Sequence, residues 1–167
     1  MKIYLLGYMG SGKTNLGREM SELSGMKFAD MDDLFEGRYK VSILEFFGKY
    51  DEELFRRLER EILLGTEGMD DCVISTGGGA PCFFNNMDFI RAQGRSVYLK
   101  MSVPALTERL SSIRKKRPLL QNIPPEELER HIMNQLLERE PFYLRADLVL
   151  EGPDFSAADV LEKIRRL

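Results

Sequence analysis

The residues best suited to chemistry lie near the start of the chain, where Gly7 to Thr14 read GYMGSGKT. In the pattern G-x-x-x-x-G-K-T, backbone N–H groups and the positive end of the following helix hold nucleotide phosphates. We expect Lys13 to reach the β- and γ-phosphates and the Thr14 hydroxyl to ligate Mg²⁺. A glycine-rich turn that matches by chance is the alternative, but the apolar stretch before the loop and the amphipathic one after it disfavour it. The residues expected to contact the nucleotide here are Gly10, Ser11, Gly12, Lys13, Thr14 and Asn15.

Two carboxylates, Asp30 and Asp32, follow at the end of a short apolar stretch, Met26 to Asp32. In an extended chain residues two apart point to the same face, which predicts that both carboxylates lie near the phosphate loop. One would belong to the Mg²⁺ shell while the other accepts a hydroxyl proton. The alternative is a solvated acidic turn with Asp32 or Asp33 as N-cap of a helix. The spacing of Asp33 and Glu36 also predicts a capping box.

Arginines further along the chain offer a different chemistry, because a guanidinium pairs bidentately with a carboxylate and stays charged. Arg56 and Glu59 lie at i, i+3 on a predicted helix, so Glu59 can hold Arg56 in its working rotamer. A plain surface salt bridge would have the same spacing. Arg139 stands two residues before Pro141, where we expect the helix to end. A solvated arginine at that helix end is the alternative interpretation.

Two further segments suggest contacts to bound molecules. Gly78 and Gly79 would let backbone amides approach a substrate oxygen, although a flexible turn explains them equally. The segment Arg114 to Pro125, RKKRPLLQNIPP, has four basic residues and three prolines and no helical period. We interpret it as a mobile flap in which Arg117 brings positive charge to the phosphates while water is excluded. A solvated basic surface is the alternative.

The elements that must position these residues are short strands alternating with helical segments. Near-continuous apolar strands separated by helices predict a three-layer α/β/α fold with a five-stranded parallel sheet and right-handed crossovers. A helical pattern covers Val41 to Leu64, with Phe55, Leu58 and Ile62 on one stripe. Ligands bind beyond the carboxyl ends of such strands, where the loops at Gly7, Asp30 to Asp32 and Gly77 should converge. The predicted strands are Lys2 to Gly7, Met26 to Asp32, Cys72 to Thr76, Ser96 to Met101 and Ala146 to Glu151.

Length and composition restrict the class of protein. The 167 residues suit a single domain over 1–167, and a net charge of −3 gives no basic excess that would favour nucleic acid. With only Cys72, Cys82 and one histidine, neither a disulfide framework nor a zinc cluster is expected. No apolar run is long enough to cross a bilayer. We therefore expect a cytoplasmic monomer without membrane or nucleic-acid partners.

Six motifs in one order resemble those of shikimate kinases and span nearly the whole chain. The resemblance implies a P-loop kinase fold, a substrate-binding region at about 32–64 and a lid at about 112–125. It also implies transfer of the ATP γ-phosphoryl group to the 3-hydroxyl of shikimate, giving shikimate 3-phosphate and ADP on the route to chorismate and the aromatic amino acids. The motifs are GYMGSGKT (7–14), DMD (30–32), FRRLE (55–59), GGG (77–79), RPLL (117–120) and REPFY (139–143).

The same resemblance implies a role for each matching residue. Lys13, Asp32 and Arg117 would be catalytic, with Arg117 also contacting ATP. Thr14 and Asp30 would bind Mg²⁺. The residues implied to bind shikimate are Asp32, Arg56, Glu59, Gly78, Gly79 and Arg139.

The sequence departs from the shikimate kinase motifs at one position, and two alternative functions remain to be weighed. Many shikimate kinases carry a second arginine seven residues before the R-P-L-L arginine, but this chain has Leu110 there, with Arg109 beside it. Another small P-loop kinase of a hydroxylated acid such as gluconate would share the nucleotide half of the site. A GTP-dependent switch is disfavoured because the chain has no N-K-x-D guanine motif.

Overall fold

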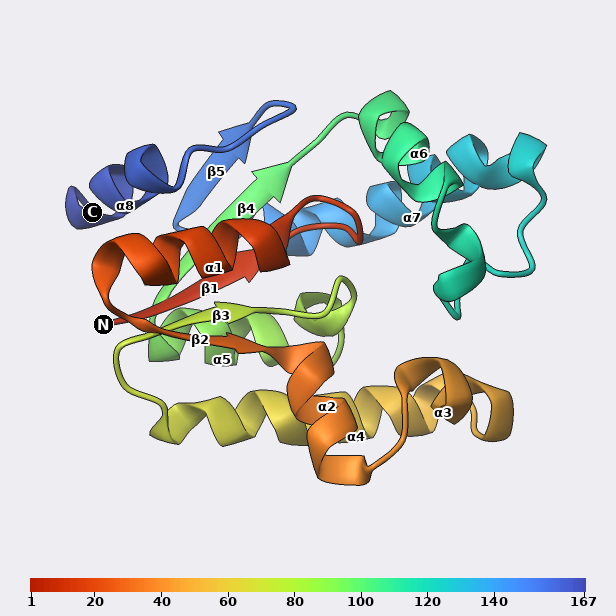
Figure 1. Cartoon of the computed structure of the whole chain (residues 1–167), viewed down its shortest axis with the longest axis horizontal. Helices are drawn as coiled ribbons and strands as arrows, with labels where there is room; N and C mark the ends of the chain where they lie inside the picture. Colours follow the sequence, from red (N-terminus) through yellow and green to blue (C-terminus); the bar gives the residue numbers. More distant parts are fainter.

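A five-stranded parallel sheet forms the centre of the protein in this computed structural model, which describes residues 1–167 apart from the side chain of Arg114. The spatial order of the strands is β2-β3-β1-β4-β5, and every neighbouring pair is parallel (Figure 1). The predicted three-layer α/β class is therefore confirmed, with strand ends shifted by one or two residues. The strands are β1 (Lys2–Leu6), β2 (Lys27–Asp30), β3 (Cys72–Ser75), β4 (Arg95–Lys100) and β5 (Leu148–Glu151).

Helices cover both faces of this sheet, as the alternation of side chains along the strands requires. In β1, Ile3 and Leu5 face a core shared with α1 and α8, whereas Tyr4 and Leu6 face a larger core on the other side. Figure 1 shows α1 and α8 together on the first face. The helices are α1 (Lys13–Ser24), α2 (Met31–Tyr39), α3 (Ile43–Lys49), α4 (Glu52–Gly65), α5 (Asn86–Gln93), α6 (Val103–Ser111), α7 (Leu128–Tyr143) and α8 (Ala157–Arg165).

The junction between β2 and α2 differs from the sequence prediction. The strand ends at Asp30, whose carboxylate Oδ1 accepts the backbone N–H of Asp32 at 2.9 Å and so caps α2. The predicted capping box of Asp33 and Glu36 is therefore wrong, as is the assignment of Asp32 or Asp33 as N-cap. Asp32 lies in the first turn of a helix, so the extended geometry predicted for the two carboxylates is also wrong. The cap, rather than strand alternation, sets their relative position.

The long helical pattern from Val41 to Leu64 is interrupted and forms two helices, α3 and α4. Ser42 and Glu45 form a complete capping box at the start of α3. At the start of α4 the Asp51 side chain accepts the N–H of Leu54 at 2.9 Å. The sequence predicted one helix because both helices face the same core, so the spacing of hydrophobic residues shows no interruption. The S-x-x-E spacing at Ser42 is a sequence signal that reveals the first of these two starts.

Pro141 does not end the helix that carries Arg139, contrary to the prediction. It lies inside α7, which continues to Tyr143. A proline this close to the end removes one backbone hydrogen bond where little helix remains beyond it, so the last turn persists. Arg139 is consequently buried, at 7% exposure, and the interpretation of a solvated arginine at a helix end is wrong.

None of the helices formed by the described residues combines the length and apolar character needed for a bilayer crossing.

Candidate active site

The phosphate loop between β1 and α1 depends on glycines in the left-handed region of backbone conformation. Gly10 has φ of 82° and Gly12 has φ of 90°, values that residues with a side chain rarely adopt. Lys13 is buried, and its Nζ donates to the carbonyl oxygens of Gly7 at 2.8 Å and Tyr8 at 3.1 Å. The loop therefore folds around its own lysine. Burial lowers the pKa of Lys13 to about 8, against the raising influence of Asp32 and Asp30.

A cavity of about 460 Å³ adjoins this loop and is lined by Gly10, Gly12, Lys13 and Thr14. The Ser11 hydroxyl is buried and has no hydrogen-bond partner among the described residues, but Ser11 does not line the cavity. Besides the loop, its lining includes Asp30, Asp32, Ser75, Arg109 and Arg117.

Arg109, and not Leu110, faces this cavity. Its guanidinium donates to the carbonyl oxygens of Gly10 at 3.2 Å and Pro153 at 2.9 Å, which joins the phosphate loop to the loop after β5. Leu110 is fully buried under Gly10. The position at which many shikimate kinases carry arginine is thus filled by a packing residue, while the neighbouring Arg109 lies at the cavity wall.

Thr14, in the first turn of α1, contacts Asp30, the last residue of β2. The Thr14 hydroxyl donates to Asp30 Oδ2 at 2.6 Å, and Ser75 Oγ lies 3.5 Å from the same hydroxyl. Hydroxyl and carboxylate oxygens are the hard ligands that Mg²⁺ prefers. The described residues contain no group of three or more His, Cys, Asp or Glu able to hold a metal by themselves. This donor set fits an ion that takes most of its ligands from phosphate and water.

Asp32 lies between the phosphate loop and a second cavity, since it lines both. Burial raises the pKa of its carboxyl to about 6, and the negative charge of Asp30 acts in the same direction, while Lys13 and Arg117 oppose the shift. Its carboxylate is therefore poised to exchange a proton near neutral pH. Arg117 also lines both cavities, so one arginine reaches the two candidate sites.

The second cavity gathers every residue for which an acid-binding role was predicted. It is smaller, about 80 Å³, and Phe47, Pro118 and Leu119 supply part of its apolar wall. Within it, Nη1 of Arg139 is buried and has no hydrogen-bond partner among the described residues. The predicted residues brought together here are Asp32, Arg56, Glu59, Gly78, Gly79 and Arg139.

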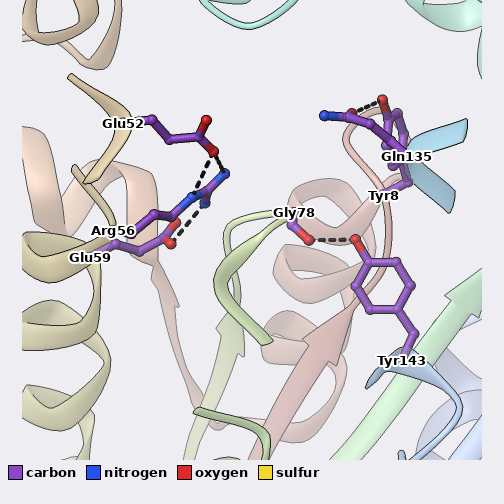
Figure 2. A network of polar contacts seen from close by, with 7 residues as sticks. All are labelled: Tyr8, Glu52, Arg56, Glu59, Gly78, Gln135 and Tyr143. Atoms are coloured by element: carbon purple, nitrogen blue, oxygen red, sulfur yellow. Dashed lines mark hydrogen bonds and ion pairs between the residues drawn. The ribbon is translucent and has the colours of Figure 1, made fainter. Parts of the chain in front are cut away.

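Arg56 is held by two glutamates, as Figure 2 shows. Its Nη1 donates to Glu59 Oε1 at 2.9 Å, and both partners are buried, so the pair is not a surface salt bridge. Its Nε and Nη2 donate to Glu52 Oε1 at 3.2 and 3.1 Å. The guanidinium also lies over the ring of Phe83 at 4.3 Å. Sequence reasoning missed Glu52 and Phe83, although the i, i+4 spacing of Glu52 and Arg56 was a usable signal.

The glycine loop after β3 approaches this cavity closely. A Cβ on Gly79 would lie 2.5 Å from Arg56 Nη1, and one on Gly78 would lie 3.2 Å from the backbone nitrogen of Met9. The Tyr143 hydroxyl donates to the Gly78 carbonyl oxygen (Figure 2). Because C=O and N–H of a trans peptide point in opposite directions, this bond turns the Gly79 N–H away from Tyr143. The loop is thus fixed and not simply flexible.

The fold and this site together define a small P-loop phosphotransferase. A sequence profile of the shikimate kinase family matches residues 9–167. The chain is 44% identical over 151 residues to shikimate kinase from Parabacteroides distasonis, covering 90% of this chain and 87% of that protein. The chain therefore belongs to the shikimate kinase family.

Solved structures agree with this membership. The crystal structure of shikimate kinase from Bacteroides thetaiotaomicron matches with a TM-score of 0.91 and 34% identity, over 100% of this chain and 99% of that one. The shikimate kinase from Acinetobacter baumannii, solved in complex with shikimate, matches with a TM-score of 0.88 and 35% identity, over 99% and 90% of the two chains. Both resemblances extend over the complete P-loop fold described above.

The two glutamates that contact Arg56 should contribute unequally to stability. We expect Glu59→Gln to lower the free energy of unfolding by about 2–4 kcal/mol, because it leaves a buried guanidinium without its buried charge partner. Glu52→Gln should cost less than about 1 kcal/mol, since that carboxylate is half exposed and screened by solvent. Urea unfolding followed by circular dichroism measures both, because the chain has no tryptophan. Equal losses would contradict the assigned difference in burial.

Proposed function

We propose that the protein transfers the γ-phosphoryl group of ATP to the 3-hydroxyl of shikimate. The observation that carries this proposal is the second cavity, where Arg56 and the unpaired Nη1 of Arg139 lie beside Asp32 and next to the phosphate loop. Membership of the shikimate kinase family and the shikimate bound to the Acinetobacter baumannii relative support the same substrate. A gluconate-type kinase would share the nucleotide half but has no comparable support.

In this proposal the larger cavity takes ATP. Backbone N–H groups of the loop and Lys13 hold the phosphates. Arg117 adds positive charge from the lid, and Arg109 lies on the nucleotide side. Mg²⁺, held by Thr14 and Asp30, would neutralise charge on the phosphates when bound.

The smaller cavity takes the acid. Arg139 offers its unpaired Nη1 to a carboxylate, and Arg56 adds a second positive charge. The Gly79 N–H, turned away from Tyr143, would donate to a substrate oxygen. Asp32, ionised above its pKa of about 6, accepts a hydrogen bond from the 3-hydroxyl. It takes that proton as the new O–P bond forms and the bond from the γ-phosphorus to the departing ADP oxygen breaks. Catalysis then rests on positioning and on charge placed opposite the phosphates.

We further infer how the chain is divided between these tasks. Residues 1–167 form one domain, in which about 32–64 bind the acid and about 112–125 act as a lid. In that lid, Leu120 is fully buried and anchors the segment, while Arg117, Pro118 and Leu119 reach the smaller cavity. The two cysteines are free, which supports a cytoplasmic location, and we expect a monomer without membrane partners.

Acceptor dependence tests the proposed function directly. With ATP and Mg²⁺ we expect ADP release in the presence of shikimate and none above background with gluconate or without an acceptor. The reason is that gluconate lacks the rigid ring that places a hydroxyl and a carboxylate at a fixed separation. A coupled ADP assay measures all three conditions. ADP release that is indifferent to the acceptor would overturn the assignment.

Loss of Arg139 should separate the two substrates. Arg139→Ala removes a buried charge-assisted contact of about 2 kcal/mol or more, so the KM for shikimate should rise at least about 30-fold. The KM for ATP should change less than about threefold, because Arg139 does not line the larger cavity. Arg130→Ala, an exposed arginine on the same helix, is the matched control. Parallel losses for both substrates would show that Arg139 serves another role.

Activity should depend on two ionisations near neutrality. Since Asp32 must be ionised to accept the proton and its pKa is about 6, kcat/KM for shikimate should fall about tenfold per pH unit below that value. Lys13 loses its charge above its pKa of about 8, so kcat/KM should fall again on the alkaline side. Initial rates measured from about pH 5 to about pH 9 test both limbs. A flat profile below pH 6 would show that ionised Asp32 is not required.

A further inference from the structure

The two arginines of the acid cavity are held in physically different ways. Arg56 is fixed by hydrogen bonds to Glu52 and Glu59, which occupy Nε and both terminal nitrogens. Arg139 has no such carboxylate partner among the ion pairs of the described residues, and its buried Nη1 is unpaired. Its guanidinium carbon instead lies 5.5 Å from the centre of the Tyr8 ring. A ring at this distance attracts a cation without accepting from its N–H donors, and the buried Nη1 stays unpaired. A hydrogen bond with the Tyr143 side chain is a second contact of this guanidinium.

Tyr8 is itself held rigidly. Its side chain is buried, at 1% exposure, and its hydroxyl donates to Gln135 Oε1 (Figure 2). Gln135 precedes Arg139 by four residues on α7, so both lie on one side of the helix. One turn of α7 therefore supplies both Arg139, whose guanidinium lies over the Tyr8 ring, and Gln135, which accepts the hydrogen bond from the Tyr8 hydroxyl.

The phenol also keeps its proton. Burial raises the pKa of Tyr8 to about 12, against the lowering influence of Arg139, so the hydroxyl remains a neutral donor at physiological pH. The backbone carbonyl oxygen of the same residue accepts from Lys13 Nζ. Tyr8 thus contacts the phosphate-binding lysine through its main chain and the helix of Arg139 through its side chain.

We propose that Tyr8 is a positioning residue for Arg139, whose ring holds the guanidinium in place while leaving its Nη1 free for the substrate carboxylate. This inference rests on the proposed function, because it assigns Arg139 to the acid. In this inference Tyr8, a residue of the phosphate loop, also takes part in binding the acid. A carboxylate in the place of Tyr8 would attract Arg139 more strongly but would occupy the donors that the substrate needs.

A purely structural role for Tyr8 makes a different prediction. If the ring only filled space in the core, its loss would lower stability and would affect both substrates or neither. If it orients Arg139, its loss raises the KM for shikimate selectively, and the effect disappears once Arg139 is absent. The two roles therefore differ in a measurable coupling between residues 8 and 139.

The test compares Tyr8→Leu, which removes the ring, with Tyr8→Phe, which keeps it. For Tyr8→Leu we expect the KM for shikimate to rise about 5- to 30-fold, with the KM for ATP changed less than about threefold. Tyr8→Phe should stay within about threefold of wild type, since phenylalanine also attracts a cation. Tyr4→Phe is the control, because it removes a buried hydroxyl that bonds to Thr66 at 2.7 Å, away from both cavities. Tyr8→Met replaces Tyr8→Leu if the latter shows no cooperative thermal unfolding.

The decisive measurement repeats the substitution in an Arg139→Ala background. There Tyr8→Leu should change the KM for shikimate less than about twofold, because the group it positions is gone. Two results would overturn this inference: a full 5- to 30-fold rise in the KM for shikimate in the Arg139→Ala background, or no rise when Arg139 is present. Neither result would affect the proposed function as long as the wild-type protein turns over shikimate. Absence of shikimate turnover in the wild type would instead overturn the proposed function and this inference with it.

Discussion

Burial of charge at the carboxyl edge of the sheet is the constraint on which the site depends. Lys13, Arg56, Glu59 and Arg139 are each less than 10% exposed, and unpaired buried charges are costly. Each is compensated in its own way: by backbone carbonyls for Lys13, by mutual pairing for Arg56 and Glu59, and by an aromatic ring for Arg139. One buried donor that remains unpaired, Nη1 of Arg139, belongs to a residue that lines the cavity proposed to bind the acid.

The scaffold supplies this arrangement through short loops whose paths exclude larger residues. In the phosphate loop a Cβ on Gly7 would lie 2.7 Å from Ser11 Oγ and 2.9 Å from the Leu99 carbonyl oxygen. After β3, the glycine loop meets Arg56 equally closely, and the Tyr143 hydroxyl holds it from α7. The parallel sheet brings these loops to one edge, and contacts between side chains and backbone then set their spacing.

The layer order and much of the candidate site followed from the sequence because they depend on local patterns. Short apolar runs separated by helical segments predict parallel strands. The spacing of glycine, lysine and threonine in the phosphate loop is specific, because few other loops have this pattern between a strand and a helix. The break before Asp51 was missed because periodicity alone cannot separate two helices that pack on one core. Phe83 and the Tyr8 ring were missed because their roles arise from contacts between segments that are distant in the sequence. Glu52 was missed although its contact with Arg56 is local, because the i, i+3 glutamate alone was taken to hold that arginine. Arg109 was noted beside the leucine at the expected position, but its hydrogen bonds to Gly10 and Pro153 join distant segments and follow only from the structure.

The shared wall of the two cavities has a consequence for inhibitor discovery. Pro118 and Leu119 line the acid cavity, and Arg117 of the same segment lines both cavities. A compound that fills the acid cavity therefore contacts the segment that also borders the larger cavity. Screening against several positions of this segment should recover ligands that a single rigid shape would miss.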